Sequence, residues 1–180
     1  MPTLIHSQVS VSVGGSEIAC EDALALTLRD APKTFPAVSP FFWLYSDPIE
    51  RTHEICDTLR ETCQLEGSHE HLFLLLYFNR VIEKLKSKAF LKDVLLPLPK
   101  ARFSLPEVRK SVPVDFAFWT GERFVAVFIH ESPFDLHGRS VEALLKIWGF
   151  DVFCLVADEF ETRGLMGDTG RRILETLQLR

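Results

Sequence analysis

The sequence predicts an α/β domain of about four mixed strands flanked by helices, preceded by an N-terminal extension of a strand and a helix. Three patterns predict this class: a strand hairpin, an amphipathic helix between two apolar strands, and a helix that is apolar on nearly every side. They cover residues 112–130, 124–156 and 69–86 respectively. A strand, a helix and a second strand in succession imply a parallel crossover, so the sheet should contain both pairing directions.

Length and composition fit one soluble domain. A chain of 180 residues buries about 70% of the surface that its unfolded form exposes. We expect a single domain over 1–180, with an N-terminal extension over 1–66 packed on a core over 67–180. The longest apolar run, Leu72 to Phe78, is far shorter than the ~20 residues that span a bilayer, so no membrane segment is expected. The first residues lack the pattern of a signal peptide, which predicts a cytoplasmic location.

The N-terminal extension should contain one strand, one short helix and one irregular connection. Residues 4–13 alternate as an edge strand does, and Gly14-Gly15 predicts a tight turn after them. Residues 21–28 have the composition of a short helix. Three prolines within 31–40 predict an irregular connection.

Capping patterns predict two consecutive long helices. Asp47, followed by Pro48, marks the start of a helix that should reach about residue 65. Ser68 caps the apolar helix 69–86. After them the sequence predicts a strand over 94–98, a loop over 101–111, hairpin strands over 112–118 and 124–130, a helix over 135–148 that ends at Gly149, an interior strand over 151–156 and a last helix over 169–177.

Asp115 is the one carboxylate in an otherwise apolar strand. A two-residue loop at Thr120-Gly121 would pair residues whose numbers sum to 241. Asp115 would then lie opposite Ala126 and diagonal to Phe128, with His130 one step further on the same face. A four-residue loop would keep the same parity of faces.

The net charge of −5 is unevenly distributed. The balance is −7 over residues 1–79, +6 over 80–110 and −4 over 111–180. The basic block can neutralise phosphates, or it can be a solvated helix end and loop. If it governs affinity for nucleic acid, replacing Lys84, Lys86 and Lys88 by Ala should flatten the dependence of binding on salt.

Cysteine usage does not by itself indicate a metal site. The four cysteines form no CxxC pair, and Cys154 lies inside the apolar strand 151–156, where a thiol behaves as a small hydrophobic group. We therefore expect reduced, structural thiols. Cys56 and Cys63 share a helix face but lack companion ligands.

The order of elements, with an aspartate in the first hairpin strand, resembles the PD-(D/E)XK nuclease superfamily, and more narrowly its very-short-patch-repair-like branch. The pieces that carry the resemblance are Val114-Asp115-Phe116, Val127-Phe128-Ile129-His130, Arg139, Leu144, Gly149-Phe150 and the strand 152–155. The resemblance covers roughly residues 68–180. It implies a restriction-endonuclease-like core, with Asp115 as a metal ligand and Glu70 as the nearest match to a helix-borne glutamate. It also implies Mg²⁺ or Mn²⁺ as the cofactor of an active member. If the domain binds nucleic acid, the candidate contacts are Arg139 and three lysines of the basic block, Lys84, Lys86 and Lys88.

Phe128 and His130 depart from the pattern of that family, which places a carboxylate and a lysine there. Phe128 replaces a ligand oxygen by an apolar ring, and imidazole is a poor ligand for Mg²⁺. The sequence therefore predicts a catalytically degenerate nuclease-like domain without a cofactor, acting as a binding or assembly module for nucleic acid, a protein partner or a second copy of the chain. The alternative is an active divalent-metal-dependent endonuclease with a rearranged site, using Asp115, His130 and a migrated carboxylate such as Glu70 or Glu83.

Overall fold

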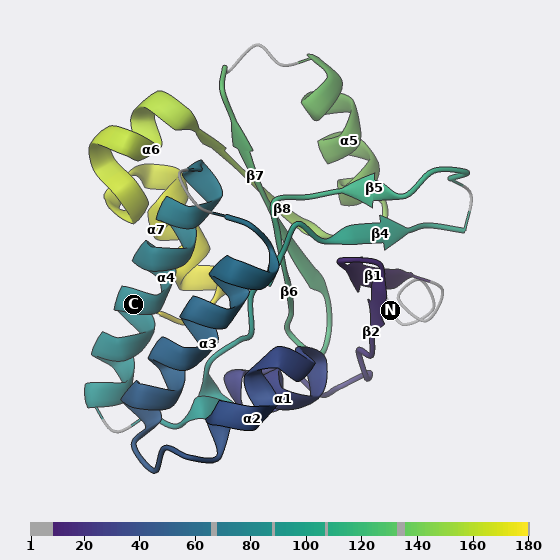
Figure 1. The fold of residues 1–180 in the computed structure, drawn as a ribbon. Helices are drawn as coiled ribbons and strands as arrows, with labels where there is room; N and C mark the ends of the chain where they lie inside the picture. The colour runs from purple at the N-terminus through teal and green to yellow at the C-terminus, as the bar shows by residue number, and fades with distance from the viewer. Residues whose placement is uncertain (1–8, 66–67, 88, 107, 133–135, 180) are drawn as a thin grey trace. The chain divides into compact units, whose positions relative to one another are not determined.

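The structure is a computed structural model, and it describes residues 9–65, 68–87, 89–106, 108–132 and 136–179. The chain forms two compact units, each made of two separate stretches of sequence (Figure 1). We call them the sheet unit, which comprises residues up to Leu26 and Pro97–Asp158, and the helical unit, which comprises Thr27–Leu96 and residues from Glu159 onward. The single domain with an extension over 1–66 stays a prediction.

The sheet unit contains an antiparallel sheet in the order β2-β1-β4-β5. Its strands are β1 (Ser10–Val13), β2 (Ser16–Ile18), β4 (Arg102–Ser104) and β5 (Val112–Pro113). Gly14 and Gly15 both have positive φ, which confirms the tight turn after β1. The predicted loop over 101–111 is wrong where β4 forms, because Phe103 is fully buried and packs edge-on against the rings of Phe124 and Phe150.

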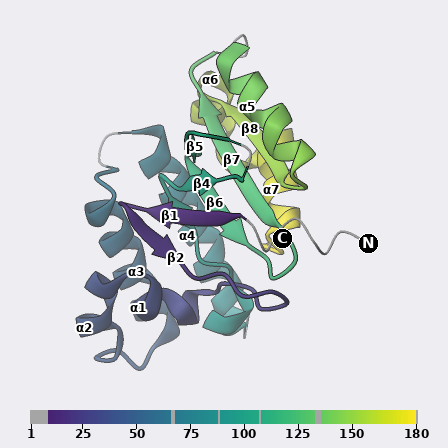
Figure 2. The same ribbon diagram turned by 90° about the vertical axis from the view of Figure 1, so that its right-hand side faces the viewer.

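A second, mixed sheet in the order β3-β6-β7-β8 completes the sheet unit. Its strands are β3 (Leu98–Pro99), β6 (Phe116–Trp119), β7 (Phe124–His130) and β8 (Asp151–Val156). β7 and β8 are parallel, and the helix that joins them, α5 (Leu136–Ile147), packs on β8 (Figure 2). The mixed α/β class and the parallel crossover are confirmed. Gly149 has φ +81, which confirms the left-handed residue after the helix.

Two of the predicted strands are wrong in extent. The strand expected over 112–118 is divided, because β5 belongs to one sheet and β6 to the other. At the division the Val114 amide donates to the Ala101 carbonyl (2.9 Å) and the Lys100 amide to the Asp115 carbonyl (2.7 Å). The strand expected over 94–98 is also mostly absent, since only Leu98 of that range lies in the sheet, and a 3₁₀ turn at Leu91–Asp93 precedes it.

The helix predicted over residues 21–28 is wrong. The segment makes one turn, in which the amide of Leu24 donates to the carbonyl of Glu21 (3.3 Å), and it pairs with the β6–β7 hairpin. The amide of Ala23 donates to the Gly121 carbonyl (2.7 Å) and the amide of Leu26 to the Trp119 carbonyl (3.1 Å). The indole of Trp119 donates to the carbonyl of Glu21 (2.9 Å). Because the end of a strand supplies hydrogen-bond partners for these backbone groups, the segment can leave them out of helical hydrogen bonds without burying unpaired groups.

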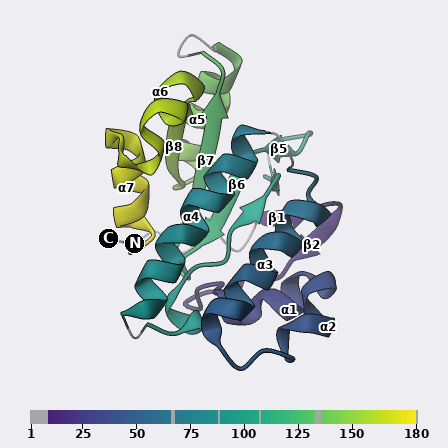
Figure 3. The ribbon, with the colours of Figure 1, turned by 60° about the vertical axis from the view of Figure 1, so that its left-hand side comes forward.

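The helical unit begins with short turns and continues with two long helices (Figure 3). Its elements are α1 (Ala31–Thr34), α2 (Ser39–Phe42), α3 (Pro48–Thr62), α4 (His69–Lys86), most of α6 (Ala157–Arg163) and α7 (Asp168–Thr176). The predicted irregular connection over 31–40 is wrong, because Pro32 and Pro36 occupy first-turn positions, where proline favours a helical turn. The last predicted helix is confirmed as α7.

Caps and burial explain why α3 and α4 were predictable. The Asp47 carboxylate accepts a hydrogen bond from the amide of Ile49 (2.9 Å), and the Ser68 hydroxyl accepts one from the amide of His71 (3.2 Å). The helices pack against each other, and Phe73 and Tyr77 of α4 are fully buried with Phe160. Within the described part of the chain, no helix combines the length and apolarity that a bilayer crossing requires.

Candidate functional site

Asp115 lies where the chain leaves one sheet of the sheet unit and enters the other. Its side chain is half-buried, and its carboxylate Oδ2 accepts a hydrogen bond from the backbone amide of Ile129 on β7 (2.6 Å). A charge-assisted hydrogen bond of this length fixes the carboxylate against the neighbouring strand. Asp115 is therefore held in one position.

The strand register places Asp115 in a row with two other side chains. β6 pairs with β7 so that Phe116 lies opposite Val127, and continuing this register places Asp115, the residue just before β6, level with Phe128. β7 pairs with β8 so that Phe128 lies opposite Cys154. Paired residues on adjacent strands point to the same face of a sheet. One face of the mixed sheet therefore carries a carboxylate, a phenyl ring and a thiol side by side.

The register predicted for Asp115 is wrong by two residues, because Ala126 pairs with Ala117. Trp119 and Phe124 are the last partners of the hairpin, so four residues, 120–123, form its loop. The side chain and backbone of Thr120 bond with the backbone of Arg123, which closes the longer loop. Asp115 consequently faces Phe128 directly and not Ala126. The parity of faces is kept, so Asp115, Phe128 and His130 still share a face.

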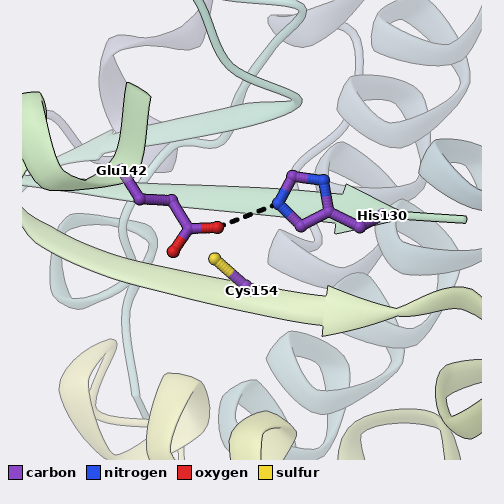
Figure 4. Close-up of side chains that lie close together, drawn as sticks. All are labelled: His130, Glu142 and Cys154. Carbon is purple, nitrogen blue, oxygen red and sulfur yellow. Dashed lines mark hydrogen bonds and ion pairs between the residues drawn. The ribbon is translucent and has the colours of Figure 1, made fainter. Parts of the chain in front are cut away.

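A second group of ionisable side chains lies on the same face (Figure 4). Nε2 of His130 on β7 is 3.0 Å from Oε1 of Glu142 on α5, and Sγ of Cys154 on β8 lies beneath them. The ligand atoms of the three side chains all lie within 4.8 Å of one another. The ring of His130 stacks on Phe128, with ring centroids 5.7 Å apart and planes at 8°. Packing and hydrogen bonding together hold the imidazole in place. We call His130, Glu142 and Cys154 the His–Glu–Cys cluster.

The cluster is shielded from water and electrostatically coupled. The side chains of His130 and Glu142 are only 14% and 15% exposed. Burial, followed by the hydrogen bond to Glu142 and the negative charge of that residue, raises the pKa of the Cys154 thiol well above its ordinary value. The charge of Asp115 adds to the rise in pKa and that of Lys146 opposes it. Without a bound cation, the thiol is protonated at neutral pH.

A cleft of about 710 Å³ opens beside these residues within the sheet unit. Asp115, Phe128 and His130 line it, and so do the cationic residues Lys100 and Arg102, which are exposed. The remaining lining residues are Gly14, Gly15, Pro113, Val114, Ile129, Gly138 and Val141. The volume suits a ligand of nucleotide size. The cleft thus combines one fixed carboxylate, an imidazole and two cations.

The residues predicted for the site are divided between the two units. Asp115 and His130 line the cleft of the sheet unit, and Arg139 lies exposed on α5 in the same unit. Glu70 is in the first turn of α4, in the helical unit. The last turn of α4 holds Lys84 and Lys86, and Nζ of Lys84 donates to the Gln178 carbonyl. Lys88 lies outside the described residues. The roles assigned to these residues stay predictions.

Sequence reasoning did not select Glu142, Cys154, Lys100 or Arg102 for the site. Glu142 follows Val141 of the apolar stripe on α5, and a lone acid beside such a stripe looks like an ordinary surface residue. Cys154 lies in an apolar strand, where a thiol is expected to behave as a small hydrophobic group. The signal for Cys154 is the parallel register of β7 and β8, which brings it level with Phe128. Glu142 reaches His130 through the packing of α5, and the sequence gives neither the register nor the packing.

Comparison with known proteins adds no assignment. No family model, no curated protein and no solved structure matches the chain.

Proposed function

We propose that the sheet unit is a nuclease-like domain that binds the phosphates of nucleic acid in its cleft and lacks the Mg²⁺ chemistry of PD-(D/E)XK nucleases. One observation carries the proposal: the carboxylate of Asp115 has Phe128 and Cys154 as its neighbours across the sheet, while two cations line the same cleft. Anions are the ligands for which such a cleft is suited.

The ligands available to a cation at Asp115 argue against Mg²⁺. Mg²⁺ requires near-octahedral coordination by oxygen. Across the sheet from Asp115 lies the phenyl ring of Phe128, which is 6% exposed, and then a thiol. A ring and a thiol give a hard cation no oxygen ligand. The position next to Asp115 is therefore unsuited to the metal on which nucleases of the resembled type depend.

The cations of the cleft favour a phosphate ligand. Lys100 and Arg102 belong to the basic stretch 80–110, and both line the cleft that contains Asp115. A guanidinium matches two phosphate oxygens, and an ammonium acts as a point charge beside them. Gly14 and Gly15 at the rim have no side chain to obstruct a backbone that enters the cleft. A nucleic-acid strand carries phosphates at the spacing that two such cations can use.

Two titrations test the proposal. Fluorescence anisotropy with labelled single-stranded and double-stranded oligonucleotides should show binding at low salt that weakens steeply as salt rises. Asp115→Asn should bind equally or slightly more tightly, because a negative charge leaves the cleft. Asp22→Asn, an exposed change outside the cleft lining, is the matched control. Absence of binding at low salt, or calorimetric Mg²⁺ binding that is tight and lost in Asp115→Asn, would contradict the proposal.

A second candidate function is a divalent-metal-dependent phosphodiester hydrolase with a rearranged site. The position of Glu142 favours this function. Its carboxylate comes from α5 rather than from β7, and it reaches the sheet face that holds Asp115 and His130. In such an enzyme a metal would lower the pKa of a bound water and stabilise the leaving oxygen. Cleavage of plasmid, single-stranded DNA or RNA that requires a divalent metal and is lost in Glu142→Gln would establish this function. If no divalent metal supports cleavage, the hydrolase is excluded.

Other expectations from the sequence remain proposals. A protein partner, a homodimer and a cytoplasmic location are compatible with the described residues. Glu70, Lys84 and Lys86 belong to the helical unit, and their participation requires its own test. The salt dependence of nucleic-acid binding supplies that test for the lysines.

A further inference from the structure

The His–Glu–Cys cluster brings three different ligand types together from three different elements. His130 comes from the end of β7, Glu142 from the middle of α5 and Cys154 from β8 (Figure 4). Their nitrogen, oxygen and sulfur atoms all lie within 4.8 Å of one another, and the nitrogen and oxygen are 3.0 Å apart. Side chains that converge in this way from a sheet and its covering helix are held by the fold itself.

The dimensions of the cluster suit a tetrahedral metal. Zinc bonds to nitrogen and oxygen at about 2.0–2.2 Å and to sulfur at about 2.3 Å, so ligands at tetrahedral angles lie about 3.3–3.8 Å apart. The separations of 3.0 Å and at most 4.8 Å bracket that range. All three atoms therefore lie near the separations that one tetrahedral ion requires.

Charge and chemical softness of the ligands select the same class of metal. A neutral imidazole, a carboxylate and a thiolate together carry two negative charges, which balance one divalent ion in a half-buried place. Imidazole and thiolate are ligands of Zn²⁺, whereas Mg²⁺ prefers oxygen alone. When the metal binds, the Cys154 S–H bond is replaced by a sulfur–metal bond and the proton leaves to solvent.

We propose that His130, Glu142 and Cys154 form a three-ligand site for Zn²⁺. Three protein ligands leave a fourth position, which in zinc sites of this kind holds water or a bound ligand. Of the three ligands, His130 lines the cleft that Asp115 also lines, so the site borders that cleft. Metal binding is measured without nucleic acid, so the proposal stands or falls independently of phosphate binding in the cleft.

Cobalt reports the site directly. Protein freed of metal by a chelator and titrated with Co²⁺ should take up one equivalent, with a thiolate-to-cobalt charge-transfer band in the near ultraviolet and visible bands of a four-coordinate ion. Addition of Zn²⁺ should abolish the charge-transfer band and the visible bands. Cys154→Ser should remove the charge-transfer band, and His130→Asn and Glu142→Gln should each weaken binding at least tenfold. Circular dichroism of each variant checks that it is folded.

Matched variants separate the cluster from other thiols and acids of the sheet unit. Cys20→Ser and Glu122→Gln change the same residue types outside the cluster and should leave the titration unchanged. If Cys154→Ser does not fold, His130→Asn and a Zn²⁺-dependent rise of the wild-type melting temperature, absent in Glu142→Gln, decide the question. The proposal is overturned if the wild-type protein gives no charge-transfer band, or if the band survives Cys154→Ser or is lost in Cys20→Ser.

Discussion

The two units of the chain differ in where they keep their ionisable side chains. In the sheet unit, Arg123 and Asp151 form a partly exposed pair, but His130 of β7 and Glu142 of α5 are only 14% and 15% exposed, and His130 lines a cleft. In the helical unit, the ion pairs His69–Glu161, Arg80–Glu83 and Arg171–Asp168 each have an acid that is more than 60% exposed. Exposed pairs contribute little to stability or chemistry, whereas shielded polar clusters beside clefts mark functional sites. The difference supports the proposal that the functional site lies in the sheet unit.

The largest expected change in the free energy of unfolding comes from a substitution in the core of the helical unit. Phe73→Ala removes a ring that is fully buried and lies 6.3 Å from that of Phe160, so it should lower the free energy of unfolding by about 3–5 kcal/mol. Urea denaturation measures the change. Phe90→Ala, at a ring that is 62% exposed, is the matched control and should cost under about 0.5 kcal/mol. Equal costs for the two changes would mean that the helical unit does not depend on this aromatic core.

A second stability prediction concerns Trp148 in the sheet unit, next to the end of α5, the helix that carries Glu142. Its place on the apolar stripe of residues 141–148 predicts a full core contact and a cost of about 3–5 kcal/mol for Trp148→Ala. In the structure it follows the last residue of α5 and is only half-buried, while Leu145 is fully buried. We therefore expect about 2 kcal/mol for Trp148→Ala and more for Leu145→Ala. Thermal unfolding of the two variants that showed the reverse order would contradict this packing.

Cys154→Val tests whether the cluster is kept for stability. A half-buried thiol replaced by an apolar group of similar size loses one hydrogen bond to Glu142 and gains apolar contact. The free energy of unfolding should change by less than about 1 kcal/mol. Equilibrium denaturation in the presence of a chelator gives the value. A loss above about 3 kcal/mol would mean that the cluster is a structural element and not a site.

The smallest effect concerns thiol chemistry in the helical unit. Burial, with the charge of Asp57, raises the pKa of Cys56 to about 12, and Arg60 opposes the rise. At pH 8 its thiolate fraction should be on the order of a thousandfold below that of an ordinary thiol, so alkylation of the folded protein should be slow. Because the folded pKa lies above the unfolded one, the contribution to stability is present below about pH 9 and is lost between about pH 9 and 12. Rapid labelling of Cys56 at pH 8, read by mass spectrometry, would contradict its burial.

Local signals predicted the elements whose determinants are local. Asp47 and Ser68 cap α3 and α4, and Gly149 follows α5, because each of these residues acts on the backbone beside it. The composition of residues 21–28 favours a helix, but their backbone groups form hydrogen bonds with Trp119 and Gly121, almost a hundred residues away. Tertiary pairing overrides propensity in such a segment.

The same distinction explains what could be predicted of the site. Asp115 and His130 were predictable because strand alternation alone places them on one face. Glu142 and Cys154 join them only through the packing of α5 and the register of β8, and both are non-local. Lys100 and Arg102 were visible as part of a basic block, but nothing in the sequence distinguishes them from Lys84 and Lys86 of α4. The structure makes that distinction through the cleft.

The most direct test of the central claim compares these two pairs of cations. Oligonucleotide affinity is measured against salt for the wild type, for Lys100→Ala with Arg102→Ala, and for Lys84→Ala with Lys86→Ala. If the cleft binds phosphates, losing its two cations should flatten the slope of log affinity against log salt by about 1.4 to 1.8, and the change on α4 should leave the slope unchanged. A flattened slope in the α4 variant with an unchanged slope in the cleft variant would contradict the claim and assign nucleic-acid binding to the helical unit.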